Sequence, residues 1–488
     1  MRKQVIKLGK NTIIYGVGNT LTRFIHLLLL PIFTAYLSPA EYGVLAILAL
    51  LNFIAIPVFS LGLSAGMGPC YFEGDNETRK ATTIWTAFLL ILLSTLLLVA
   101  LGYFFADWIS LLAFQSIDHS WLVTLSLWGV SFQILSIPFS RRLQFEEKAT
   151  LFIKITITST LISIGLSVYM VVILKLGVYG MVVSQLIGHA IYMLLFMTTA
   201  SYRMKFRFER TVCSELLKLG LPLVPSFAFL FILQHSNRYI LQWFKGLDEV
   251  GIYSIGFNFG MVMGVVVGAF QTAWYPFFMS FMERQREAIH LFGRITTLYI
   301  FGAGAFCLLF FIAAKPIVVI MTQPSFHEAY LLVGLSASAQ FLVGLFSLLL
   351  PAVYFSKDIK YVSIVQGVAA CCSIGINLIL IPPLGMLGAG IALALGYLLM
   401  VILLQVWNLM KTHAYLQITY EWVRVLKFVP VFIVIATMSL IDRELSLWTE
   451  FIFSIVLTVM LIVVMYTMLN TNEKNALLAY ITRVNENS

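Results

Sequence analysis

The chain has 488 residues, of which 60% are hydrophobic and only 11% are charged, so its composition excludes an ordinary soluble protein and indicates a polytopic membrane protein. The net charge of +9 comes from basic residues scattered between apolar stretches, which argues against a nucleic-acid-binding protein. The five cysteines form no C-x-x-C pair and no metal-ligand spacing, so we expect no disulfide, no metal site and no cofactor.

Fourteen apolar stretches are long enough to cross a membrane as helices, so the sequence predicts an all-α protein with about 14 transmembrane helices. The predicted spans are 11–37, 42–67, 81–106, 120–140, 149–174, 178–200, 216–244, 250–282, 295–321, 329–355, 361–381, 386–409, 425–441 and 447–469. Pro57, Pro276 and Pro351 lie inside three of these spans and predict kinks or breaks there.

The distribution of basic residues predicts the orientation in the membrane. An even number of spans places both termini on the same side. Of the 31 Lys and Arg residues, 24 lie on that side, four lie on the opposite side and three lie within spans. Because positively charged connections stay in the cytoplasm, both termini are predicted to be cytoplasmic.

Two sequence landmarks recur at one common offset of 208 residues. Glu-Tyr-Gly at 41–43 recurs as Glu-Val-Gly at 249–251, and Leu-Gly-x-x-Gly at 176–180 recurs at 384–388. Six predicted spans separate the copies, so both copies run in the same direction through the membrane, as in transporters built from parallel repeats. The predicted divisions are a first lobe, a second lobe, and two further helices with a short tail: 1–205, 206–415 and 416–488.

The first predicted span carries a basic residue, Arg23, close to its centre. At helical spacing Arg23 shares one face with Asn19 and His26. An arginine at mid-membrane is costly and usually faces a bundle interior or an aqueous cavity. One explanation is a structural ion pair, but no Asp or Glu lies well inside any predicted span. We therefore interpret this face as the wall of a transport pathway in which Arg23 binds an anionic group.

The seventh predicted span carries a second polar stripe, in which Gln234 and Arg238 share a helix face beside His235. Arg238 either faces the pathway or extends to the outer headgroups. His26 and His235 occupy similar depths in the two copies, and each is either polar lining, a proton-coupling site or a packing histidine. The candidate substrate-binding residues are Arg23, Arg238, Asn19, His26, Gln234 and His235.

The run LSPAEYG at 37–43, which follows the polar first span, resembles the opening of polysaccharide-unit flippases of the O-antigen type. These belong to the multidrug/oligosaccharidyl-lipid/polysaccharide (MOP) transporter superfamily. The resemblance extends over about residues 1–470, and Leu45 departs from it, because the family often has tyrosine there.

The resemblance implies a flippase of the bacterial inner membrane that serves cell-surface polysaccharide biosynthesis. Such a protein moves a polyprenyl-diphosphate-linked oligosaccharide repeat unit from the cytoplasmic to the outer leaflet by alternating access. The expected partners are this lipid-linked oligosaccharide, membrane lipids, and the polysaccharide polymerase and chain-length machinery, with no nucleic acid among them.

Three alternatives stay open on the sequence alone: a multidrug or cation antiporter of the same superfamily, a peptidoglycan-precursor flippase, and a membrane glycan polymerase or ligase. A cation exporter would more naturally carry acidic residues in its cavity, whereas this chain carries arginines. A polymerase or ligase needs a sizeable outer loop, and the longest outer connection, 107–119, is short. We therefore expect a transporter and not an enzyme.

Overall fold

A computed structural model of the protein describes these residues: 24–73, 77–202, 204–282, 284–356, 358, 360–411, 418, 421–440 and 447–468. The described residues form helices and short connections, with no strand among them, which confirms the prediction of an all-α protein. Ten helices in this part of the chain are long and apolar enough to cross a membrane. The count of 14 stays a prediction.

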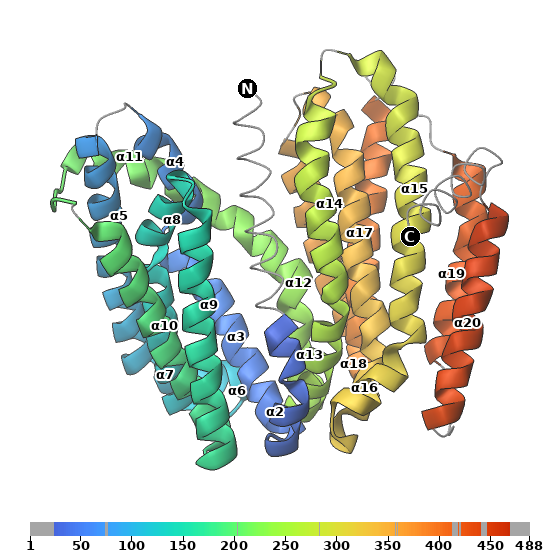
Figure 1. The fold of residues 1–488 in the computed structure, drawn as a ribbon, viewed down its shortest axis with the longest axis horizontal. Coiled ribbons are helices and arrows are strands. Elements are labelled where there is room, and N and C mark those ends of the chain that lie inside the picture. The colour runs from blue at the N-terminus through green and yellow to red at the C-terminus, as the bar shows by residue number, and fades with distance from the viewer. Residues whose placement is uncertain are drawn as a thin grey trace, which may run out of the picture. The chain divides into compact units, whose positions relative to one another are not determined.

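The helices follow one another with short connections, as Figure 1 shows. Those of the first half are α2 (Leu30–Tyr36), α3 (Pro39–Phe59), α4 (Leu63–Phe72), α5 (Glu77–Phe104), α6 (Ala106–Phe114), α7 (Ser120–Leu135), α8 (Ile137–Phe145), α9 (Ala149–Val168), the π-helical η1 (Tyr169–Ile173) and α10 (Gly177–Ser201). Those that follow are α11 (Arg210–Gly220), the 3-10 segment η2 (Leu221–Leu223), α12 (Val224–Lys245), α13 (Leu247–Gly260), α14 (Val262–Met279), α15 (Gln285–Ile312), α16 (Ala314–Met321), the 3-10 segment η3 (Pro324–Ala329), α17 (Tyr330–Phe355), α18 (Lys360–Lys411), α19 (Trp422–Leu440) and α20 (Leu447–Met468).

The predicted span 42–67 is two helices, α3 and α4, rather than one kinked helix. Pro57 lies inside α3, and the break comes after it, where Leu61 and Gly62 have φ values of +55° and +67°. These left-handed values cannot continue a right-handed helix. The break redirects the chain, so that α4 packs against α5 and α11.

Two further predicted spans are divided. Span 216–244 comprises the end of α11, η2 and α12, and Pro222 lies in η2, where its missing N–H interrupts the hydrogen-bond ladder. Span 250–282 breaks between α13 and α14, whereas the predicted break point, Pro276, lies inside α14. Pro351 likewise lies inside α17. Proline alone is therefore a poor guide to the breaks in this chain.

The described helices form two compact units. The first consists of the chain up to Ile255, with Thr322–Phe326 and Gln366–Gly396. The second consists of Gly256–Met321, His327–Val365 and the described residues from Tyr397 onward. Helices α11, α12 and most of α13 thus group with the helices of the first repeat, and the predicted divisions at 205 and 415 stay predictions.

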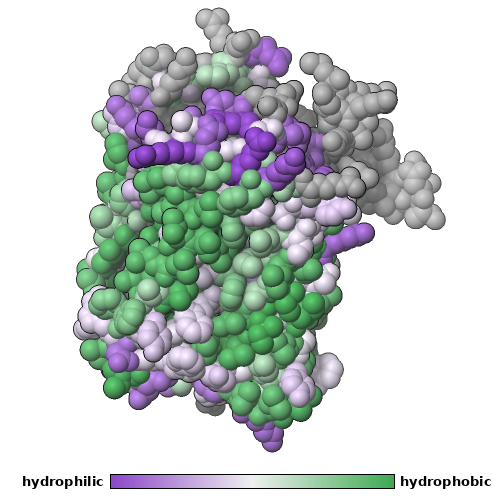
Figure 2. Space-filling view, turned by 90° about the vertical axis from the view of Figure 1, so that its left-hand side faces the viewer, coloured by the Kyte–Doolittle hydropathy of each residue, from purple (hydrophilic) through white to green (hydrophobic). Residues whose placement is uncertain are grey.

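The first unit presents a hydrophobic band to its surroundings. Figure 2 shows, on the face that carries α5 and α10, a broad apolar band between two hydrophilic rims. Leu93, Leu96 and Leu97 on α5 and Leu194 on α10 are all exposed. Exposed leucines of this density on long apolar helices belong in the hydrocarbon core of a membrane.

The second unit has an aromatic core whose polar atoms are satisfied by backbone. The Trp274 indole N–H of α14 donates to the Ser347 carbonyl of α17 over 3.0 Å. The Tyr299 hydroxyl of α15 donates to the Phe341 carbonyl over 2.9 Å. These bonds link α14 and α15 to α17 inside the membrane, where an unpaired backbone or side-chain group is costly.

The two copies of the repeat meet at a symmetric backbone contact between α3 and α13. A β-carbon on Gly43 would overlap the Leu247 carbonyl oxygen, and one on Gly251 would overlap the Pro39 carbonyl oxygen. Leu247 and Gly251 follow Pro39 and Gly43 by the same 208 residues that separate the sequence landmarks. Glycine is therefore needed at both positions, because each side chain would occupy the space of the partner backbone.

Each copy also has a glutamate that lies against the Leu-Gly-x-x-Gly landmark of its own copy. The Met386 N–H donates to the Glu249 carboxylate over 2.8 Å, next to Gly385, where φ is +55°. In the first copy, a β-carbon on Gly177 would lie 2.6 Å from Glu41 Oε1, and φ of Gly177 is +54°. The two landmarks found in the sequence are thus the two sides of one joint, present in both copies.

Cysteine labelling tests the predicted orientation. Ser38, Asp118 and Arg207 are exposed in connections or at a helix cap. In single-cysteine variants, Ser38→Cys and Asp118→Cys should react with a membrane-impermeant maleimide added outside the inner membrane, and Arg207→Cys should react only after that membrane is permeabilised. The reverse pattern would overturn the orientation and the predicted direction of transport.

Candidate functional site

The structure describes four of the six candidate substrate-binding residues. Asn19 and Arg23 lie outside the described residues, so their roles stay predictions. His26 lies in the helical stretch 24–28 and is exposed. The other three lie together on α12: Gln234, His235 and Arg238.

Arg238 is buried against α13. Arg238 is only 7% exposed, and its guanidinium carbon lies 5.9 Å from the centre of the Tyr253 ring. The Asn237 side-chain amide donates a hydrogen bond to the Tyr253 hydroxyl. Tyr253 itself is 1% exposed. The guanidinium thus points into the first unit in a cation–π arrangement rather than outward to the headgroups, which argues against the snorkelling alternative.

His235, three residues before Arg238 on α12, lies among aromatic rings. Its ring is edge-on to Phe53 of α3 at 4.7 Å and lies 5.5 Å from the ring of Phe231. Phe53 and Phe231 also stack on each other at 5.8 Å. This environment favours the packing-histidine alternative for His235, and it does not bring the imidazole together with the ring of Tyr253.

The polar stretch of α12 and α13 has hydrogen-bonding capacity that the described residues do not fill. Buried atoms with no partner in this part of the chain are His235 Nδ1, Ser236 Oγ, Asn237 Oδ1, the Tyr239 hydroxyl oxygen and Ser254 Oγ. A buried polar atom without a partner costs about 1–3 kcal/mol. Such atoms also occur on other described helices, for example Trp128 Nε1 and Asn408 Oδ1, so those of α12 and α13 provide capacity for a polar ligand or water without by themselves marking a site.

The buried charge in the first unit is positive. Among the described residues, two charged side chains are buried, Arg238 and Glu450. Glu450, in the first turn of α20, lies 3.1 Å from Lys315 of α16, and this ion pair joins two helices of the second unit. The α12 stretch therefore offers a cation and neutral hydrogen-bonding groups, which suit an anionic, hydroxyl-rich ligand.

Sequence reasoning missed two residues of this cluster. Asn237 and Tyr253 are not among the six candidates that the sequence predicts. No spacing along α12 points to Tyr253, because it lies on the next helix and meets Arg238 only in the folded chain.

The sequence matches the family described as "Polysaccharide biosynthesis protein" over residues 8–282, which is more than half of the chain. A relative from the Lsg locus of Haemophilus influenzae is 22% identical over 288 residues. That alignment covers 58% of this chain and 69% of the relative.

The fold resembles those of solved transporters. The lipid II flippase MurJ, in an inward closed conformation, superposes with a TM-score of 0.72 at 16% identity, covering 93% of this chain and 99% of that one. An inward-facing multidrug resistance MATE family transporter of the MOP superfamily superposes with a TM-score of 0.66 at 14% identity, covering 80% and 95%. Together with the match over residues 8–282, this places the chain in the polysaccharide biosynthesis protein family, with the fold of MOP-superfamily transporters.

Proposed function

We propose that this membrane transporter is a flippase for a polyprenyl-diphosphate-linked oligosaccharide repeat unit. It moves this cargo from the cytoplasmic to the outer leaflet of the bacterial inner membrane by alternating access, and so supplies cell-surface polysaccharide synthesis. The observation that carries the proposal is the buried cation Arg238 within a polar stretch of α12, in a chain of the polysaccharide biosynthesis protein family.

The chemistry of the cargo fits the side chains of α12. A diphosphate is anionic, and a guanidinium binds phosphate oxygens through two parallel hydrogen bonds. In the proposal Arg238 turns from Tyr253 to the diphosphate during transport. Arg23, in the first predicted span, binds the diphosphate as well. Asn19, His26, Gln234 and His235 line the path of the sugar, where neutral donors and acceptors replace water.

An apolar groove in the second unit suits the hydrocarbon part of such a cargo. It lies between α15 and α20 and has a volume of about 460 Å³. Gly302 and Ala305 of α15 leave room opposite Leu461 and Ile462 of α20. A polyprenyl chain in this groove gains many van der Waals contacts, each small but large in sum.

The alternatives are less well supported. The MOP fold also carries multidrug transporters, but a cation exporter needs a negative site, whereas the buried charge on α12 is positive. MurJ is a lipid II flippase, and at 16% identity the likeness extends to the fold and not to the cargo. For an enzyme, the outer connection 105–119 offers only the nine-residue helix α6 and a turn as a place for reacting groups.

Deletion of the gene tests the proposal. Surface polysaccharide should be lost, a lipid-linked oligosaccharide should accumulate facing the cytoplasm, and the intact gene supplied in trans should reverse both. The lipid-linked species is identified by mass spectrometry of extracted lipids. Unchanged surface polymer with new sensitivity to cationic dyes would indicate an antiporter instead. Accumulation of a peptidoglycan precursor with lysis would indicate the other flippase class.

A further inference from the structure

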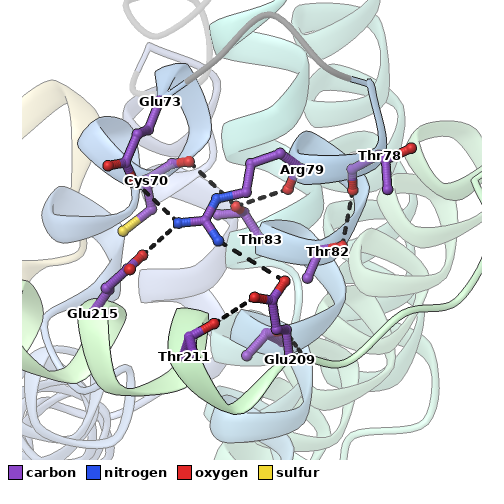
Figure 3. A network of polar contacts seen from close by, with 10 residues as sticks. Cys70, Glu73, Thr78, Arg79, Thr82, Thr83, Glu209, Thr211 and Glu215 are labelled. Carbon is purple, nitrogen blue, oxygen red and sulfur yellow. Dashed lines mark hydrogen bonds and ion pairs between the residues drawn. The ribbon is translucent and has the colours of Figure 1, made fainter.

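Arg79, near the start of α5, is surrounded by three carboxylates. They come from two parts of the chain that are distant from each other in sequence. Its guanidinium nitrogens lie 2.5 Å from Glu215, 3.1 Å from Glu73 and 3.9 Å from Glu209. Glu73 directly follows α4, whereas Glu209 and Glu215 lie in the connection and helix that lead to α12. Figure 3 shows the three carboxylates converging on this one side chain. Arg79 therefore joins α4 and α5 to α11.

The other end of α11 is held by backbone contact. A β-carbon on Gly220, the last residue of α11, would overlap the Leu61 carbonyl oxygen, and one on Gly62 would overlap the Gly220 carbonyl oxygen. A β-carbon on Gly66 would lie 3.0 Å from the Gly220 α-carbon. Helix α11 is thus fixed at both ends to the turn and helix that follow α3, although the predicted division at 205 assigns it to the second lobe.

We infer that Arg79 is a positioning residue for transport: it fastens α11 to α4 and α5, and so fixes the point at which α12, with Arg238, begins. Only the three residues of η2 separate α11 from α12. A shift of α11 is therefore passed directly to the polar stretch of α12. The role of Arg79 in transport rests on the proposed function. The attachment of α11 by Arg79 does not depend on that proposal.

The charge balance makes Arg79 the cation that these three carboxylates share. One guanidinium here faces three carboxylates, two of which move with α11. Without the guanidinium, Glu73 repels Glu209 and Glu215, and solvent weakens this repulsion because their side chains are 67%, 50% and 42% exposed. Loss of Arg79 thus does more than remove a contact.

Cys70 reports whether α11 stays in place. This α4 residue is 2% exposed, and Figure 3 shows its thiol beside Glu215. Burial and the negative charge of Glu215 raise the pKa of the Cys70 thiol, whereas the positive charge of Arg79 lowers it, and its burial protects it from labelling. Cys307 of α15 is fully buried in the second unit and reports general unfolding.

The experiment measures, across a range of pH, the rate at which N-ethylmaleimide labels each cysteine of the purified full-length protein, read by peptide mass spectrometry. The pH dependence separates a change of exposure from a change of the Cys70 pKa, which Arg79 and Glu215 both influence. In Arg79→Ala, labelling of Cys70 should rise on the order of tenfold, as expected for a local opening, while Cys307 stays protected. Surface polysaccharide in cells should fall in parallel. Lys80→Ala is the matched control, because Lys80 is the next residue of α5 and pairs with Glu77 of the same helix.

A charge exchange separates positioning from general damage. Arg79→Glu combined with Glu215→Arg restores attraction between α5 and α11, so both the slow labelling of Cys70 and the surface polymer should return toward wild type. Glu215→Gln removes the shortest ion pair with little change of shape and should raise the Cys70 rate by a smaller factor. This variant decides the question in case Arg79→Ala also exposes Cys307.

Each outcome has a definite reading. An unchanged Cys70 rate in both Arg79→Ala and Glu215→Gln would overturn the attachment. Fast labelling of Cys70 with normal surface polymer would overturn the positioning role while leaving the proposed function intact. Failure of the charge exchange to restore either readout would also overturn the inference. If gene deletion leaves surface polymer unchanged, the proposed function fails, and the labelling result still tests the attachment.

Discussion

Gly251→Val should abolish surface polysaccharide while the protein still inserts into the membrane. The valine β-carbon would overlap the Pro39 carbonyl oxygen, which is backbone and cannot turn aside. The ends of α3 and α13 must therefore separate, and overpacking of this kind costs about 1–3 kcal/mol. We propose that the closed joint is one of the states of the proposed alternating-access cycle, so its loss should stop transport. The measurement is surface polymer normalised to the amount of protein in the membrane.

The reciprocal position and a control sharpen this test. Gly43→Val should have the same effect, because Gly43 meets the Leu247 carbonyl in the symmetric contact. Val250, next to Gly251, is fully buried, so the rate at which Val250→Cys is labelled with and without Gly43→Val tests whether this substitution opens the joint. Gly165→Val on α9 is the control, since nothing lies within 4 Å of its added β-carbon. Full activity of Gly251→Val would contradict the proposed role of the joint.

Arg238→Ala should strongly reduce transport without lowering the amount of protein in the membrane. Loss of a buried cation makes α12 more apolar, so insertion should not suffer. Arg238→Lys keeps the charge but loses the planar fork that binds two phosphate oxygens, so it should retain only part of the activity. Lys245→Ala is the control, because Lys245 is an exposed cation at the end of the same helix.

Tyr253→Phe separates a packing role from a cargo-binding role. Phenylalanine keeps a ring for the Arg238 guanidinium and loses the hydroxyl that Asn237 contacts. Transport should fall less in Tyr253→Phe than in Arg238→Ala. Arg23→Ala, which the sequence places nearer to the middle of a span, should have the larger effect of the two arginine substitutions. Normal transport by well-expressed Arg238→Ala would show that its charge does not meet the cargo.

The sequence by itself determined the class of the protein and the repeat. Hydropathy measures transfer free energy averaged along a helix, so it finds apolar helices regardless of how they pack. The common offset of 208 residues marked Glu41, Gly43 and their copies, and these became one symmetric joint in the structure. Such landmarks can be recognised in the sequence because each consists of residues that lie close together along the chain.

Only the tertiary structure decided where the helices break and which distant groups meet. The break after Phe59 depends on the backbone angles of Leu61 and Gly62, to which an average over a whole span is insensitive. Arg79 and Glu215 are 136 residues apart in the sequence. No local sequence pattern predicts which of the distant charged residues will form an ion pair with a given arginine. The direction of Arg238 likewise follows from Tyr253 on the next helix, because long-range packing, and not the spacing along α12, selects the side on which a guanidinium is buried.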